Sequence, residues 1–202
     1  MNSKVKLWSI QNKDKLIELE SNGFINCLEN KYSKDWETEY RWMAKEMKTK
    51  IGLPKIKNQY PIWAWYQYHD SKHRKPDLRR NGHLPKGTKG IRIEFDKPTN
   101  KVLLSDFILW HSPLSYKSYI AENEKEREQF ENKLIKLRIE GVSFQKLPKK
   151  IKTEIENSWQ RIFEMNPKDE NYTDKKDKKM IQACCWQINK SEIRKIETFI
   201  AK

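Results

Sequence analysis

The sequence predicts an α+β fold in which helices flank a central sheet. Two observations point to this class. Stretches with the alternating pattern of β-strands occur near the start, in the middle and near the end of the chain. Helical stretches separate them at uneven spacing, which does not favour a regular doubly wound sheet. Because 202 residues suit one core of ordinary size, we expect a single domain, residues 1–202.

The first quarter of the chain predicts a strand and two helices. Residues 5–10 form the strand, and Asn12 can cap a helix that ends at Gly23. Ser33 can open a second helix, which ends near Gly52. Apolar residues recur at helical spacing, and we interpret them as core: Leu16, Ile17 and Leu19 in the first helix, and Trp36, Tyr40, Met43 and Met47 in the second.

An aromatic strand and a basic loop follow. Residues 61–68 alternate as a strand does and carry aromatic side chains on both faces: Trp63 and Trp65 on one, Tyr66 and Tyr68 on the other. Residues 69–90 are polar and basic and contain Gly and Pro, so they predict a long loop. Long ordered loops often carry function.

The middle of the chain predicts a hairpin and then a helical region. Residues 91–95 and 102–107 read as two strands joined by a good turn sequence, and we expect them to pair as a hairpin. Two helices, of about residues 117–140 and 148–165, should follow as an insertion or flank of residues 117–165. Their apolar lines are Phe130, Leu134 and Leu137 in the first helix, and Ile151, Ile155, Trp159 and Ile162 in the second.

The end of the chain predicts a loop, a strand and a helix. Residues 166–179 are charged and almost free of apolar side chains, so we expect a mobile surface loop. Residues 181–188 read as a last strand. Ser191 can cap a final helix with Ile193, Ile196 and Phe199 on its apolar face.

The charge of the chain favours an acidic partner. Lys plus Arg number 42 against 28 Asp plus Glu, a formal net charge of +14. A field of this sign raises the local concentration of polyanions such as nucleic acid. The alternative is that the lysines are spread over all faces of the protein and only form a solvated surface.

Cysteine usage and hydropathy indicate a cytoplasmic protein. Cys27, Cys184 and Cys185 give neither an even disulfide framework nor a metal-ligand spacing, so we expect a reducing compartment and no metal. Neither a secretory leader nor a run of eighteen apolar residues is present, and we expect no membrane partner.

Phosphate-binding, dinucleotide, metal and nucleophile-elbow motifs are absent from the sequence. The first weaker candidate is the aromatic strand beside the basic loop, since stacking faces next to cations suit a nucleobase and its phosphate. Arg79 and Arg80 suit phosphate because the guanidinium fork matches two oxygens, and Lys72 and Arg74 add charge. The alternative is that these aromatic residues are half core and half surface.

The second and third candidates lie on two other strands. Asp106 could orient His111 or accept a substrate hydroxyl, and His111 is the best placed histidine for proton transfer. The alternative is a helix-capping Asp106 and a partly buried His111. On the last predicted strand Gln182 and Cys184 share a face, and inert burial is the favoured interpretation of the thiol.

Several short motifs carry a resemblance to the domain-of-unknown-function family 3841. They are Leu7-Trp8-Ser9-Ile10-Gln11, Pro61-Ile62-Trp63-Ala64-Trp65-Tyr66, Lys75-Pro76-Asp77-Leu78-Arg79, Val102 to Phe107 with Trp110-His111, Ser158-Trp159 and Ile181-Gln182-Ala183. The resemblance covers nearly the whole chain. This resemblance provides reference positions along the chain, but it implies no activity.

A more distant resemblance is to ADP-ribosyltransferases of the DarT type. It implies the central, mostly antiparallel, split sheet of those enzymes and NAD as the cofactor, held by Ser9, Trp63, Tyr66 and Arg79, with Asp106 or His111 near the acceptor. The chain departs from their pattern where a glutamate should follow Gln182-Ala183, because Cys184 stands there. A neutral thiol cannot support a developing positive charge. Glu94, Asp77 or Asp106 would then have to substitute for it.

Two functions follow from these observations. The chain is either an ADP-ribosyltransferase-like enzyme that acts on nucleic acid or protein, or a non-catalytic module that binds a nucleotide or nucleic acid through the same aromatic and basic segments. A third possibility is a structural partner protein whose charge is only compositional. Both functional hypotheses require the first, the tryptophan-rich and the last strand to lie side by side.

Overall fold

The computed structural model describes residues 3–28, 36–169 and 172–202 and has the α+β arrangement that the sequence predicts. The α-helices are α1 (Lys15–Asn22), α2 (Glu37–Ile51), α3 (Phe107–His111), α4 (Glu124–Lys136) and α5 (Lys149–Ser158). The strands are β1 (Lys4–Asn12), β2 (Phe24–Asn26), β3 (Ile62–Gln67), β4 (Lys89–Pro98), β5 (Leu103–Asp106), β6 (Ile181–Cys185), β7 (Gln187–Asn189) and β8 (Ile193–Ile200).

The chain forms two compact units. The first, here called the sheet unit, comprises residues 1–104 and 181–202. The second, the helical unit, comprises residues 105–180 and is inserted into the sequence of the first. The helical unit contains residues 117–165, the region that the sequence predicts as a helical insertion or flank.

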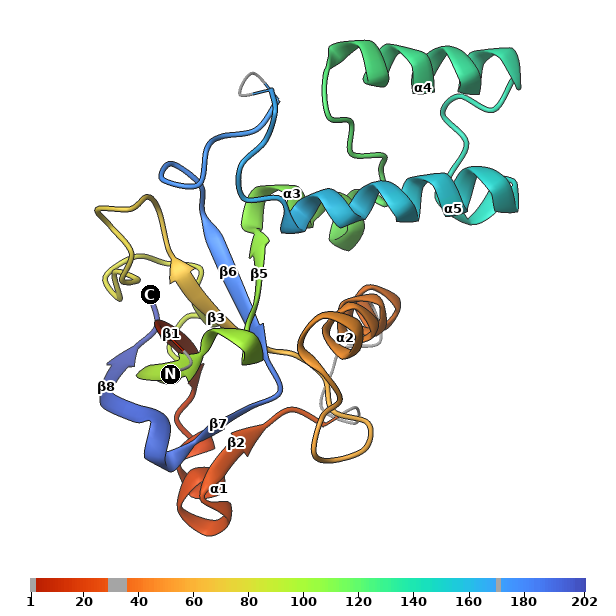
Figure 1. Ribbon diagram of the computed structural model, residues 1–202. Helices are drawn as coiled ribbons and strands as arrows, with labels where there is room; N and C mark the ends of the chain where they lie inside the picture. Colours follow the sequence, from red (N-terminus) through yellow and green to blue (C-terminus); the bar gives the residue numbers. More distant parts are fainter. Residues whose placement is uncertain (1–2, 29–35, 170–171) are drawn as a thin grey trace. The chain divides into compact units, whose positions relative to one another are not determined.

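A six-stranded antiparallel sheet has the strand order β5-β6-β3-β1-β4-β8, and β2 and β7 form a separate two-stranded sheet. The first strand, the tryptophan-rich strand and the last predicted strand are therefore neighbours, as both functional hypotheses require (Figure 1). Trp65 is the register partner of Trp8 on β1 and of Gln182 on β6. Since partners in an antiparallel pair point to the same side, these three side chains share one face of the sheet.

The other face of the sheet packs on the main core. Leu7 on β1 pairs with Phe95 on β4, and Ile62 on β3 pairs with Cys185 on β6, and all four are buried. The cluster continues into α1 and β2 through Leu19, Ile25 and further aliphatic side chains. Apolar side chains at every second position of the strands produce this core, which is the physical basis of the strand predictions.

The predicted hairpin is wrong. Residues 89–98 and 103–106 are strands, but β6, β3 and β1 lie between β5 and β4 in the sheet. The turn signal is real, because Thr99–Lys101 forms one turn of 3-10 helix. That turn joins two strands that pair elsewhere: β4 pairs with β1 and β8.

The predicted final helix is also wrong, since residues 193–200 form strand β8. The predicted cap Ser191 lies inside a 3-10 turn, Lys190–Glu192, whose capping box is formed by Asn189 and Glu192. A register shift in the β4–β8 pairing places Ile193 opposite Phe95 and Ile196 opposite Ile93. The inserted residue lets side chains three apart reach the same face, which mimics helical spacing.

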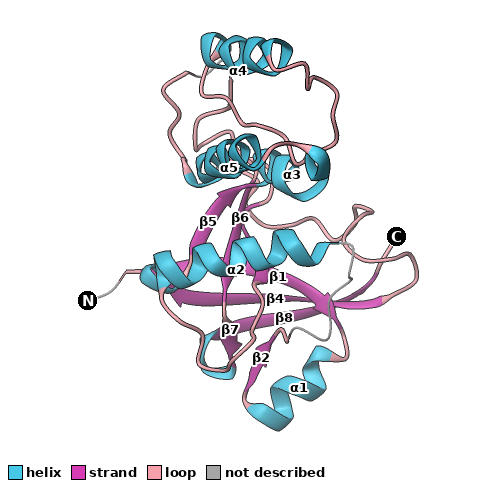
Figure 2. Cartoon of the chain, turned by 90° about the vertical axis from the view of Figure 1, so that its right-hand side faces the viewer, coloured by secondary structure: helices cyan, strands magenta, loops and turns pink. Residues whose placement is uncertain are grey.

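The two N-terminal helices follow the prediction with local differences. α1 ends at Gly23, whose φ of 74° is left-handed and whose N–H donates to the Leu19 carbonyl, but Ile17 is exposed. In α2, Met43 and Met47 are fully buried, whereas Trp36 is 48% exposed and not core. Figure 2 shows α2 lying across the sheet. The predicted cap Ser33 lies outside the described residues.

The helical unit has shorter helices than predicted. α4 covers only residues 124–136, and Leu137, expected on its apolar line, is 52% exposed. α5 continues as a 3-10 turn, Trp159–Phe163, and its predicted apolar line is buried: Ile151, Ile155, Trp159 and Ile162. In the described part of the chain, the helices are all too short or too polar to cross a membrane.

Candidate functional site

The basic loop, defined as residues 69–88, is tied to the sheet by a buried arginine. Arg92 on β4 is 6% exposed, and its guanidinium donates to the Pro76 carbonyl and to the Glu197 carboxylate on β8. Lys75 of the loop lies 3.3 Å from the same carboxylate. At the end of the loop, the Gly87 N–H donates to the Ala201 carbonyl. The loop is therefore ordered by contacts from two strands.

Arg74 is a second anchor of the basic loop. Its Nε donates to the Tyr66 carbonyl at 3.0 Å, and its guanidinium lies 4.2 Å from the centre of the Tyr66 ring and 5.8 Å from that of Trp8. The Trp8 indole N–H in turn donates to Glu94 at 2.9 Å. These contacts hold Arg74 against the sheet, so the guanidinium predicted for nucleic acid is already engaged with the protein.

An aromatic row runs from the sheet to the basic loop and consists of Trp65, Tyr68 and His83. The rings of Trp65 and Tyr68 meet edge to face at 4.9 Å, and Tyr68 lies 5.5 Å from His83. The three residues are half-buried. Gly90 helps to close the loop end, because a Cβ there would lie 2.6 Å from the Phe199 ring, which itself meets His83.

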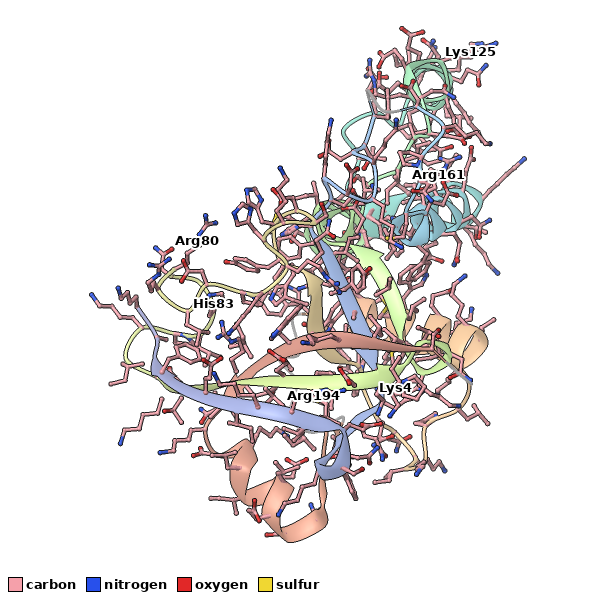
Figure 3. The ribbon with its side chains drawn as sticks, turned by 60° about the vertical axis from the view of Figure 1, so that its left-hand side comes forward. Lys4, Arg80, His83, Lys125, Arg161 and Arg194 are labelled. Carbon is pink, nitrogen blue, oxygen red and sulfur yellow. The ribbon has the colours of Figure 1, made fainter. Side chains whose placement is uncertain are left out.

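Cations project from the outer side of the basic loop. Arg79 pairs with Asp77 at 2.7 Å, and this hydrogen-bonded guanidinium holds the Asp77 pKa far below its ordinary value. Lys72 and Arg80 are exposed, and neither has an ion pair with any residue that the structure describes. Figure 3 shows Arg80 on the outer part of the loop and His83 nearer to the strands.

The residues expected to hold NAD do not share one surface. The Ser9 hydroxyl donates to the Trp63 carbonyl at 2.8 Å and is fully buried. Ser9 points to the core face, since its neighbour Trp8 pairs with Trp65 on the other face. The Trp63 ring, which shares the face of Trp65, meets Tyr40 of α2 edge to face at 5.8 Å.

Cys184 stands next to Trp63 on the neighbouring strand and is fully buried. Burial raises the pKa of its thiol well above the ordinary value, and the neighbouring Cys185 raises it further. The thiol is therefore protonated at neutral pH. It can supply neither the negative charge of a catalytic glutamate nor a reactive thiolate.

Asp106 and His111 belong to the helical unit. Asp106 caps α3 by accepting from the backbone N–H groups of Ile108 and Leu109. Its carboxylate also pairs with the Lys179 ammonium at 2.5 Å, in a fully buried contact. The His111 Nδ1 lies 2.9 Å from the Phe107 carbonyl one turn earlier. Both side chains are thus engaged by other groups of the helical unit.

Sequence reasoning missed Arg92 and the aromatic row. A signal for Arg92 was available, because residues 91–95 alternate Ile, Arg, Ile, Glu and Phe. An arginine and a glutamate on the non-core face of a central strand need partners from another segment. The contact of Tyr68 with His83 joins residues fifteen positions apart across an irregular loop, and no periodic pattern encodes it.

Comparison with known proteins gives one match. The family model for a domain of unknown function, numbered 3841, matches residues 6–194. No curated protein and no solved structure matches the chain. In the described part of the chain, His, Cys, Asp and Glu side chains do not gather in a group of three that could hold a metal ion.

Proposed function

The chain belongs to the domain-of-unknown-function family 3841, and we propose that it is a non-catalytic module that binds single-stranded nucleic acid through its basic loop. One observation carries the proposal. Lys72 and Arg80 project from a loop that the sheet holds in place, beside the half-buried rings of Trp65 and Tyr68, and neither has an ion pair with a described residue.

The chemistry of the basic loop suits a strand with accessible bases. Exposed ammonium and guanidinium groups attract phosphates, and a net charge of +14 raises the local concentration of a polyanion. Aromatic side chains stack on bases of any sequence, which requires bases that are not already stacked in a duplex. Arg92 and Arg74 order the loop before binding, so less conformational entropy is lost on association.

One observation favours the enzymatic alternative. The three strands that an ADP-ribosyltransferase of the DarT type would place around NAD are neighbours in the sheet. Against it weigh the buried Ser9 hydroxyl and the protonated Cys184 thiol. Release of nicotinamide from NAD by the purified protein would favour the enzyme over the binding module.

The test of the binding module is fluorescence anisotropy with a labelled oligothymidylate of about 15 nucleotides, a length that spans one typical binding groove. The double variant Lys72→Gln/Arg80→Gln should weaken binding about tenfold, since two phosphate contacts are lost. The matched control is Lys45→Gln/Lys48→Gln, which removes the same charge from exposed positions of α2.

The control variant should bind within about twofold of the wild type, because charges away from the contact act only through a screened field. Equal weakening by both double variants would show that binding follows net charge alone. That outcome, or the absence of any binding at low salt, would end the proposal.

A further inference from the structure

A cavity lies at the opposite end of β4 from the basic loop. Its volume is about 230 Å³, and Leu53, Lys55, Lys97, Lys101, Trp186 and Glu192 are among its lining residues. All of them belong to the sheet unit. β4 meets the basic loop at Lys89 and reaches the cavity at Lys97, so at about 3.3 Å per residue the two places are roughly 25 Å apart.

The walls of the cavity are largely apolar. Trp186 is 7% exposed, and its indole N–H donates to the Gly52 carbonyl at 2.8 Å. This bond fixes the ring and satisfies its polar group, so the small part of the ring that lines the cavity is apolar. Leu53 is 78% exposed at the cavity. A planar or hydrocarbon group can gain burial against both side chains.

One lysine of the cavity is structural. The Lys97 side chain is 6% exposed and lies 2.7 Å from a carboxylate oxygen of Glu192. The Lys97 ammonium also donates to the Gln187 carbonyl at 2.7 Å. These contacts neutralise the charge of Glu192 and hold the loop after β7. Neither group of this ion pair is left to attract a ligand.

Among the described residues, the other two lysines of the cavity have no counter-ion. Lys55 and Lys101 are exposed, and neither forms an ion pair with a described residue. Lys101 lies beside the segment that holds Trp186, because its ammonium would be 3.9 Å from a Cβ placed on Gly52. The cavity therefore combines a fixed apolar wall with two uncompensated positive charges.

We infer that this cavity binds a small organic anion, a planar apolar group that carries one phosphate or carboxylate. The apolar group would lie against Trp186 and Leu53, and the anionic group would lie between Lys55 and Lys101. At about 230 Å³ the cavity is smaller than the roughly 300 to 1,000 Å³ that hold drug-sized ligands, so the ligand is about the size of a single substituted ring.

The test is an NMR titration of the protein, labelled with ¹⁵N in its tryptophan indoles, with phenyl phosphate as the probe. The Trp186 indole signal, assigned with Trp186→Phe, should shift and saturate at or below about 1 mM. Phenol and inorganic phosphate should each bind at least about tenfold more weakly, because phenol lacks the phosphate and inorganic phosphate lacks the ring.

Two variants locate the binding. Leu53→Asp places a negative charge at the cavity without removing a buried contact, and it should weaken phenyl phosphate at least about tenfold. Lys55→Gln/Lys101→Gln should weaken it by a similar factor. The matched control is Lys72→Gln/Arg80→Gln, which makes the same change of charge at the basic loop and should leave phenyl phosphate binding unchanged.

Three results would overturn the inference: no saturable shift of the Trp186 signal, equal affinity for inorganic phosphate, or equal weakening by the basic-loop control. The inference is separate from the proposed nucleic-acid binding. Lys55→Gln/Lys101→Gln should leave oligothymidylate affinity within about twofold, so failure of one proposal leaves the other open to its own test.

Discussion

Replacement of Arg92 by leucine should loosen the basic loop and destabilise the sheet unit. Arg92 is the buried link between β4, the loop and β8, through its bonds to the Pro76 carbonyl and the Glu197 carboxylate. Its side chain is 7% exposed, whereas that of Glu197 is 29% exposed. The substitution removes both bonds at once and leaves the sheet register untouched.

The cost of this substitution can be worked out from its partners. Removing one member of a fully buried ion pair costs about 3–5 kcal/mol, because the other charge is left buried alone. Glu197 is partly exposed and keeps Lys75 at 3.3 Å and Lys195 at 3.2 Å. Its charge is thus compensated after the loss of Arg92. We therefore expect a lower cost, about 2–3 kcal/mol of unfolding free energy.

Urea unfolding followed by circular dichroism measures this cost, and hydrogen exchange measures the local effect. Amides of residues 69–88 should exchange faster in Arg92→Leu than in the wild type. Arg92→Lys, which keeps the charge and one donor for Glu197, should lose less stability than Arg92→Leu. A stability change below about 0.5 kcal/mol, with unchanged exchange in the loop, would refute the anchoring role of Arg92.

Three further predictions concern other ionisable groups. Lys179→Met should lower the free energy of unfolding in urea by about 3–5 kcal/mol, because the buried Asp106 carboxylate loses its partner. Lys178 is exposed, so Lys178→Met should lower it by less than about 0.5 kcal/mol. Arg92 and nearby lysines lower the Glu197 pKa from 4.5 to about 2. This folded pKa lies below the ordinary one, so its stabilisation is present above about pH 4.5 and is lost as the pH falls toward 2. Glu197→Gln should flatten the stability profile in that window by about 1–2 kcal/mol, allowing for partial exposure; an unchanged profile would contradict this. Burial raises the Cys185 pKa to about 12, so both β6 thiols should react with Ellman's reagent at pH 8 only after denaturation.

The strands that form the core could be predicted because their signal is local. Leu7, Ile62 and Ala183 occupy alternating buried positions, and each strand buries one face against the same cluster. The pairing of strands is not local. The turn after β4 looks like a hairpin turn in sequence, yet β4 pairs with a strand some ninety residues earlier, Leu7 with Phe95.

The error at β8 has a different cause. The spacing of Ile193, Ile196 and Phe199 is that of a helix face, and a capping box of Asn189 and Glu192, rather than the predicted Ser191, precedes it. A β-bulge opposite Glu94 and Phe95 shifts the register by one residue, so Ile193 and Ile196 both reach the core. Phe199 then points to the other face and packs over Gly90. A bulge cannot be read from one strand alone, because it is a property of the pair.

The candidate site was predictable where residues are exposed and less so where they are buried. The basic character of the loop is visible in the sequence, and Lys72 and Arg80 remain exposed and unpaired with described residues. The partners that engage Ser9 and Asp106 are distant in sequence: the Trp63 carbonyl lies 54 residues from Ser9, and Lys179 lies 73 residues from Asp106. Such partners decide whether a polar side chain is available, and only the folded chain specifies them.

The salt dependence of oligonucleotide binding tests the central claim most directly. For single strands, the slope of log affinity against log salt is about −0.7 for each phosphate that is neutralised. If Lys72 and Arg80 each contact a phosphate, Lys72→Gln/Arg80→Gln should make the wild-type slope shallower by about 1.4. An unchanged slope in this variant would contradict the assignment of the basic loop as the nucleic-acid interface.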